Sequence, residues 1–65
     1  MPNGYFKLHK SEKDTNQPYW FTLHAGNHEQ IARSEMYPDM DTMKVGLKSV
    51  QKNGSSTDIR DETGE

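Results

Sequence analysis

The 65-residue chain contains no cysteine, and it has few large apolar side chains. The missing cysteines exclude a disulfide framework, a thiolate metal site and a cysteine nucleophile. Leu, Ile, Val and Phe together supply nine residues. No apolar run approaches the roughly 20 residues that a membrane-spanning helix needs. The net charge of −2 offers no excess of positive charge for nucleic acid. We therefore expect one small domain, residues 1–65, with no membrane partner and nothing that favours a nucleic-acid partner.

So small a chain has little apolar surface to set against the entropy lost on folding. Ordering costs about 1.5 kcal/mol per residue, which a chain without disulfides offsets by unusually good packing, a metal or oligomerisation. The nearest approach to a metal spacing is His24-x3-His28-Glu29. Two histidines four residues apart share a face only on a helix, and we place these residues on a strand and in a turn. A fourth ligand for a structural zinc site is also missing. We therefore expect no metal or other cofactor, and we expect a homodimer.

Polar and apolar residues alternate in two segments, which predicts two strands. Residues 5–10 place Phe6 and Leu8 on one face, and residues 19–25 do the same for Phe21 and Leu23. The polar, proline-ended segment Ser11–Pro18 is a loop whose order stays open. Gly26-Asn27-His28 predicts a turn. Two antiparallel strands should therefore lead into a third.

The third strand, residues 29–34, has an open register. A two-residue turn would put Ala32 on the core face, and a three-residue turn would put Ile31 there. A later segment, residues 57–61, is a candidate for a short fourth strand with Ile59 as its apolar anchor. The ordered core should span about residues 4–61, and residues 62–65 should fray.

One segment, residues 39–52, has helical periodicity. Its apolar stripe consists of Met40, Met43, Leu47 and Val50. Asp39 is a good N-cap, and Asn53-Gly54 is a stop signal. Gly46 lies beside the stripe, which suggests a close approach of the helix to the sheet. The order is β-β-β-α-β, an α+β fold of two layers with an antiparallel sheet and one helix.

The order and spacing of several short motifs resemble the YegP-like family, also called DUF1508 or UPF0339. The resemblance runs from Gly4 to about Asp61. The motifs are Gly4-Tyr5-Phe6-x-Leu8, Phe21-x-Leu23-x-Ala25-Gly26-Asn27-x-Glu29, Ile31-Ala32-x-Ser34-Glu35-x-Tyr37 and Gly46-Leu47-x-Ser49-Val50-x-x-Asn53. His28 departs from the glycine usual in that family, and the Ser11–Pro18 loop is longer than usual.

The resemblance implies a β(3)-α-β unit. In that family two units, in one chain or two, build a single sheet by exchanging their C-terminal strands. This chain has one unit, so the resemblance implies a dimer with exchanged C-terminal strands. The family's function is unassigned, so no catalytic residue carries over.

The residues preceding Gly4 have no basic region and no apolar stretch of a secretory signal, so we expect a cytoplasmic protein.

The strand face turned away from the core carries the candidate partner or ligand surface. If the faces are kept, antiparallel pairing places His9 near Trp20 and Tyr5 near His24. Such a face could bind a partner, a nucleotide base or a small aromatic ligand, whereas ordinary cross-strand packing is the simpler explanation. The residues of this surface are Tyr5, Lys7, His9, Trp20, Thr22 and His24.

The sequence favours a non-catalytic interaction or accessory module. An alternative is weak binding of single-stranded nucleic acid, through stacking on Trp20 and Tyr5 with help from Lys7 and a helical row of lysines. A third is an enzyme that uses the histidines. No serine lies in a Gly-x-Ser-x-Gly elbow, and spacing identifies no acid–base pair. We therefore expect no enzyme and assign no catalytic residue.

Overall fold

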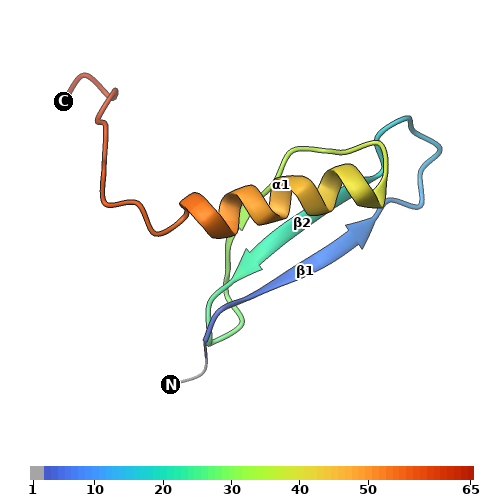
Figure 1. Cartoon of the computed structure of the whole chain (residues 1–65), viewed down its shortest axis with the longest axis horizontal. Coiled ribbons are helices and arrows are strands. Elements are labelled where there is room, and N and C mark those ends of the chain that lie inside the picture. The colour runs from blue at the N-terminus through green and yellow to red at the C-terminus, as the bar shows by residue number, and fades with distance from the viewer. Residues whose placement is uncertain (1–2) are drawn as a thin grey trace.

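The computed structural model describes residues 3–65, and Met1–Pro2, where the expected domain begins, lie outside the described residues. Three strands, β1 (Tyr5–Lys10), β2 (Tyr19–His24) and β3 (Gln30–Arg33), are followed by one helix, α1 (Met40–Asn53). The strands form an antiparallel sheet in the order β1-β2-β3, and α1 crosses it and contacts β2 (Figure 1). The predicted α+β arrangement of an antiparallel sheet and one helix is confirmed.

The pairing of β1 with β2 keeps the two faces that alternation predicts. Phe6 lies opposite Leu23, and Leu8 lies opposite Phe21. The two phenylalanine rings meet edge to face, with 6.0 Å between their centroids. Because side chains alternate along a strand, the intervening residues all point to the other side of the sheet. The β1–β2 hairpin therefore has one apolar face toward α1 and one polar and aromatic face.

The turn before β3 combines both registers that the sequence left open. The Ala25 N–H donates to Glu29 O at 2.8 Å, which leaves three residues in the turn. The register then shifts between Leu23 and His24, so that Leu23 faces Ala32. A three-residue turn alone would have put Ile31 opposite Leu23. The irregularity restores Ala32 to the helix side, and Ile31 is 59% exposed.

Helix α1 begins and ends close to the predicted residues. Asp39 is the N-cap, and one of its carboxylate oxygens accepts from the Thr42 N–H at 2.8 Å. Hydrogen bonds from the backbone N–H and the hydroxyl of Thr42 hold the pKa of the exposed Asp39 carboxyl below its usual 3.8. At the other end the Gly54 N–H donates to Val50 O at 2.7 Å. Gly54 has φ −67°, so the stop does not use the left-handed conformation common at helix ends.

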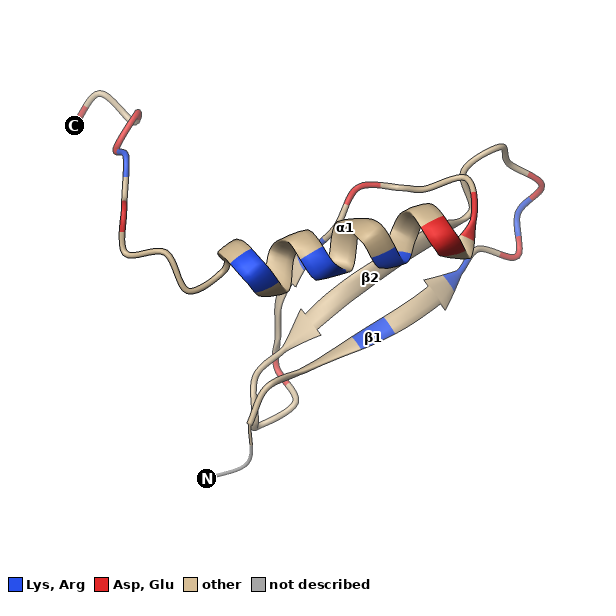
Figure 2. Cartoon of the chain, in the orientation of Figure 1, with Lys and Arg blue, Asp and Glu red and all other residues tan. Residues whose placement is uncertain are grey.

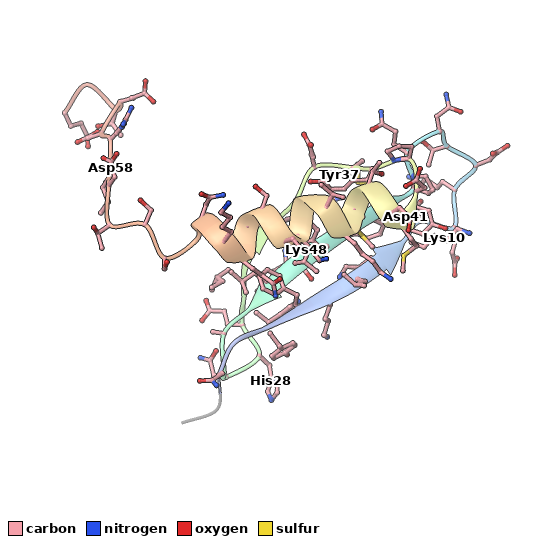
Figure 3. The ribbon with its side chains drawn as sticks, viewed as in Figure 1. Lys10, His28, Tyr37, Asp41, Lys48 and Asp58 are labelled. Atoms are coloured by element: carbon pink, nitrogen blue, oxygen red, sulfur yellow. The ribbon has the colours of Figure 1, made fainter. Side chains whose placement is uncertain are left out.

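The core is small and centres on β2. Among residues 3–65, Phe21 and Met43 are the buried hydrophobic side chains. The Tyr37 ring stacks on Phe21 at 6.2 Å between centroids, and Figure 3 shows Tyr37 beside α1. A Cβ at Gly46 would lie 2.7 Å from Tyr37 Cζ. The predicted close approach at Gly46 exists, but Tyr37 of the preceding loop makes it rather than a strand.

Two apolar residues that the sequence assigns to packing, Leu8 and Ile59, are exposed in the single chain. Leu8, predicted to face the core, is 43% exposed, because α1 contacts β2 and leaves β1 partly uncovered. The predicted strand over residues 57–61 is not formed. Residues 55–65 are irregular and exposed, and they extend away from the sheet and α1 (Figure 1). A strand needs a neighbouring edge to pair with, and residues 55–65 have none here.

Candidate functional site

The sheet face opposite α1 carries the six predicted surface residues, and two of them are buried. Thr22 is 3% exposed and His24 is 7% exposed, although they lie on the open face. The rings of the flanking residues cover them. Tyr5 stacks on His24 at 5.2 Å between centroids, and His9 stacks on Trp20 at 4.9 Å. Both pairs are the cross-strand neighbours that alternation predicts.

A chain of hydrogen bonds runs along this face through Thr22. The Thr22 hydroxyl lies 2.8 Å from His9 Nε2 and 2.7 Å from His24 Nε2. His24 Nδ1 lies 3.4 Å from the carbonyl oxygen of His28, and His28 Nδ1 lies 2.8 Å from the Tyr5 hydroxyl. Every buried side-chain nitrogen and oxygen in the described part of the chain has a hydrogen-bond partner. The face is therefore a satisfied polar network.

The donors and acceptors give this chain a direction. A carbonyl oxygen only accepts, so His24 Nδ1 carries the hydrogen, and in neutral His24 the Nε2 atom accepts. The single Thr22 hydroxyl hydrogen then goes to His24, and Thr22 Oγ accepts from His9 Nε2–H. With both rings neutral, this direction assigns opposite tautomers to His9 and His24 around one shared hydroxyl.

The remaining polar side chains of the face lie near the edges. Lys7 is opposite Thr22 on β1 and is exposed. Arg33 is opposite Thr22 on β3, and its guanidinium carbon lies 5.4 Å from the centroid of the Trp20 ring. Trp20 therefore has a ring neighbour from β1 and a cation from β3.

Sequence reasoning missed two participants, His28 and Arg33. His28 has a positive φ of 73°, which turns its side chain into reach of Tyr5. The sequence signal for positive φ lay on Gly26 and Asn27, whereas the structure has it at the next residue, His28. Arg33 reaches the open face because the shift between Leu23 and His24 sets the register. Alternation alone could not place Arg33 while two registers were open.

The structure brings the histidines together without a metal-binding geometry. Within residues 3–65 no group of three or more His, Asp or Glu side chains is placed to hold a metal ion. Glu29, the third residue of the His24-x3-His28-Glu29 spacing, donates its N–H to Asn27 Oδ1 in the turn. The Thr22 hydroxyl forms hydrogen bonds with the Nε2 atoms of His9 and His24. The face thus presents ring edges and a few cations rather than a nucleophile with a free base.

The helix adds a row of cations away from this face. Lys44, Lys48 and Lys52 are exposed, and their blue bands repeat along one side of α1 in Figure 2. Their spacing of four residues is that of one helix side. Within residues 3–65 the one ion pair joins Arg60 to Asp58 at 3.0 Å, so no lysine of this row is paired there.

No helix in that range has the length and apolar character to cross a membrane.

Comparison with known proteins gives a family without an assigned role. The family model described as "Domain of unknown function (DUF1508)" matches residues 14–61. A UPF0339 protein of Bordetella pertussis is 47% identical over 51 residues, which cover 78% of this chain and 42% of that protein. A UPF0339 protein of Pasteurella multocida is 42% identical over 60 residues, which cover 92% and 50%.

A third relative carries the name that the sequence resemblance suggested. The UPF0339 protein YegP of Escherichia coli is 39% identical over 54 residues, which cover 80% of this chain and 49% of that protein. The chain thus spans about half the length of the curated relatives it matches. No solved structure gives a significant match. The match to the family model over most of the chain, together with these relatives, shows that the chain belongs to the DUF1508 (UPF0339) family.

Proposed function

We propose that this chain is a non-catalytic, cytoplasmic interaction module that works as a homodimer, in which two copies exchange their C-terminal segments. The observation that carries the proposal is the state of Ile59. It is the single large apolar residue of residues 55–65, and it is 89% exposed in an irregular segment. An isolated apolar side chain gains by burial about 1.5–3 kcal/mol, which the single chain does not provide.

An unfilled apolar pocket supplies a place for Ile59 of a second copy. The pocket has a volume of about 300 Å³ and lies between the sheet and the end of α1. Phe6, Leu23 and Val50 are among its apolar lining residues. Val50 is 39% exposed, so the pocket leaves apolar surface open to water. Filling it would enlarge a core that has only two buried hydrophobic side chains among the described residues.

A free sheet edge lies next to this pocket. Ala32 of β3 is a lining residue, and β3 is at the edge of the sheet. An edge strand presents unpaired N–H and C=O groups to any extended segment that comes alongside. We place residues 57–61 of the second copy there, paired with β3. The relatives, about twice as long, have room for a second unit in one chain.

The proposal assigns no catalysis to the open face. Its buried hydroxyl and the histidine nitrogens around it bond to one another. Within the network, the one hydroxyl hydrogen of Thr22 is taken up by the histidine nitrogens beside it and is not spare for a substrate. We regard this face as the surface of the module that meets other molecules.

Solution mass by light scattering tests the assembly. We expect the full chain to have about twice the 7.5 kDa mass of one chain, and a version truncated after Gly54 to be monomeric or unfolded. Ile59→Asp should dissociate the dimer. Val45→Asp is the matched control, because Val45 is also exposed, at 70%, but lies on α1 away from the pocket lining.

Three results would overturn the proposal. One is a monomeric full chain at tens of micromolar. Another is a dimer that survives truncation after Gly54. The third is equal dissociation by Ile59→Asp and Val45→Asp. A monomer whose stability falls on truncation would show that residues 57–61 fold back onto the pocket of their own chain.

A further inference from the structure

A second hollow lies on the open face, at the end where β1 and β2 are joined by the Ser11–Pro18 loop. Its volume is about 540 Å³, within the 300–1,000 Å³ usual for small-molecule sites. Trp20, Arg33 and Met36 line it from the sheet side, and loop residues that include Lys13 line the other side. All of these residues belong to one chain, so the groove does not depend on dimer formation.

Arg33 is held in this groove, the hollow described above, by contacts that use few of its N–H donors. The guanidinium carbon lies 5.4 Å from the Trp20 ring centroid, and one terminal nitrogen donates to Met36 Sδ at 3.8 Å. A thioether is a weak acceptor, and a guanidinium has five N–H donors. Arg33 is exposed and has no carboxylate partner among residues 3–65. The guanidinium of Arg33 is thus held in place, with most of its N–H groups available to bind a ligand.

The rest of the lining favours an anion. Lys13 is a second cation, and no Asp or Glu is among the lining residues. The Ser11 and Thr15 side-chain oxygens accept from backbone N–H groups of Lys13 and Gln17, which leaves both hydroxyl hydrogens available to donate. A guanidinium and an ammonium with hydroxyl donors recognise phosphate or carboxylate oxygens. His9 and Arg33 lie over the Trp20 ring at 4.9 and 5.4 Å, so the indole offers its apolar edge to this cluster.

We propose that this groove binds a small planar ring that carries an oxyanion, with Arg33 on the oxyanion and Trp20 beside the ring. Arg33 forms bidentate hydrogen bonds to two oxygens, and Lys13 adds a second charge contact. The ring lies against the edge of the indole and the Met36 side chain. The Ser11–Pro18 loop forms the outer wall and so determines the size of ligand that enters.

Trp20 is the single tryptophan of the chain, so its indole N–H gives one resolved NMR signal within the groove. The full chain is titrated with adenosine 5′-monophosphate and with nicotinate, which carry a phosphate and a carboxylate respectively. Adenosine and inorganic phosphate each lack one half of the proposed ligand. We expect saturable shifts of the indole signal with one or both ring anions at about 1 mM or below, and at least about tenfold weaker binding of adenosine and phosphate.

Variants separate this site from general attraction of anions. Arg33→Gln should weaken the ring anion at least about tenfold, and Arg33→Lys should restore little, because an ammonium has no planar fork. Lys52→Gln removes the same charge at the end of α1, outside the groove lining, and should leave the affinity unchanged. Circular dichroism checks that each variant is folded, and Lys13→Gln repeats the test from the loop side.

Several outcomes would overturn the proposal. They are the absence of a saturable shift with either ring anion, equal affinity for inorganic phosphate alone, and equal losses in Arg33→Gln and Lys52→Gln. Binding of the phosphate compound and not the carboxylate, or the reverse, would support the proposal and identify the oxyanion. None of these results depends on the mass of the assembly, so the groove and the dimer can fail separately.

Discussion

The Tyr37 ring occupies the space that a side chain at Gly46 would need. A Cβ there would lie 2.7 Å from Tyr37 Cζ and 3.2 Å from Tyr37 Cε1. Tyr37 in turn stacks on Phe21, one of the buried residues of the core. A glycine inside a helix costs about 1 kcal/mol relative to alanine. The helix tolerates this cost because the missing side chain lets an aromatic ring pack between α1 and β2.

Gly46→Ala should therefore destabilise the protein, although alanine is the better helix former. We expect a net loss of about 1–3 kcal/mol in the free energy of unfolding, measured with urea, because a tightly packed ring must shift. Ser49→Ala, at an exposed position of the same helix, is the control and should change stability by a few tenths of a kcal/mol at most. Tyr37→Phe added to Gly46→Ala should recover part of the loss. Equal stability of Gly46→Ala and the native chain would contradict this packing.

Removal of the Thr22 hydroxyl should break the polar chain of the open face. Thr22→Val keeps the shape and the strand preference, but it leaves His9 and His24 without their shared partner in a buried site. We expect a loss of about 1–3 kcal/mol in unfolding free energy. Nitrogen-15 NMR of the imidazoles should show His24 as the Nδ1–H tautomer and His9 as the Nε2–H tautomer in the native chain. Thr15→Val, in the exposed loop, should have little effect, and identical tautomers in the two rings would refute the assigned direction.

The Asp39 cap predicts a stability change in acid. The folded-state pKa of Asp39 lies below its usual 3.8, because Thr42 donates hydrogen bonds to the ionised carboxylate. The charged form thus stabilises the fold above about pH 4, and this contribution is lost as the pH falls through the lowered pKa. Asp39→Asn should flatten the dependence of the melting temperature on pH below about 4, while the amide still caps the helix. Asp14→Asn, in the 11–18 loop, is the control, and unchanged acid sensitivity in Asp39→Asn would exclude the cap as its source.

His28 is strained by its left-handed backbone, with φ 73°. That conformation costs an ordinary residue about 1–2 kcal/mol, and glycine adopts it freely. His28→Gly gives up the exposed hydrogen bond to Tyr5, worth about 0.5–1 kcal/mol. We therefore expect a net gain of about 0.5–1 kcal/mol in thermal or urea denaturation. Tyr5→Phe, which removes the same hydrogen bond without altering the turn, measures that contribution, and a loss of stability in His28→Gly would show that the bond outweighs the strain.

Local patterns were enough to predict the hairpin and the helix. Alternation around Phe21 and Leu23 determined which residues of β1 and β2 share a face, because a slip by one residue would expose the whole apolar set. The helix followed from the stripe that contains Met43 and from the Asp39 cap. These features depend on residues that are close together in the sequence, because side-chain periodicity and helix capping are local effects.

Other features depend on contacts that no short stretch contains. The shift beside Leu23 determines the face on which Arg33 lies, and the turn signals allowed two registers. The burial of Thr22 and His24 arises from rings on the neighbouring strand and in the turn. Pattern reasoning placed all six surface residues on one face, but it could not show that two of them are covered. The partner of Gly46 was equally hidden, since Tyr37 lies in an irregular segment whose path only the folded chain defines.

Two reciprocal backbone bonds join Tyr19 to Tyr37, with the Tyr37 N–H donating at 2.7 Å and the Tyr19 N–H at 3.1 Å. They extend the ladder of β2 into the segment that leads to α1. The bridge therefore holds the start of α1 close to β2 even when the helix itself opens locally. Amide exchange at Tyr19 and Tyr37 should follow the opening of the sheet rather than the fraying of α1.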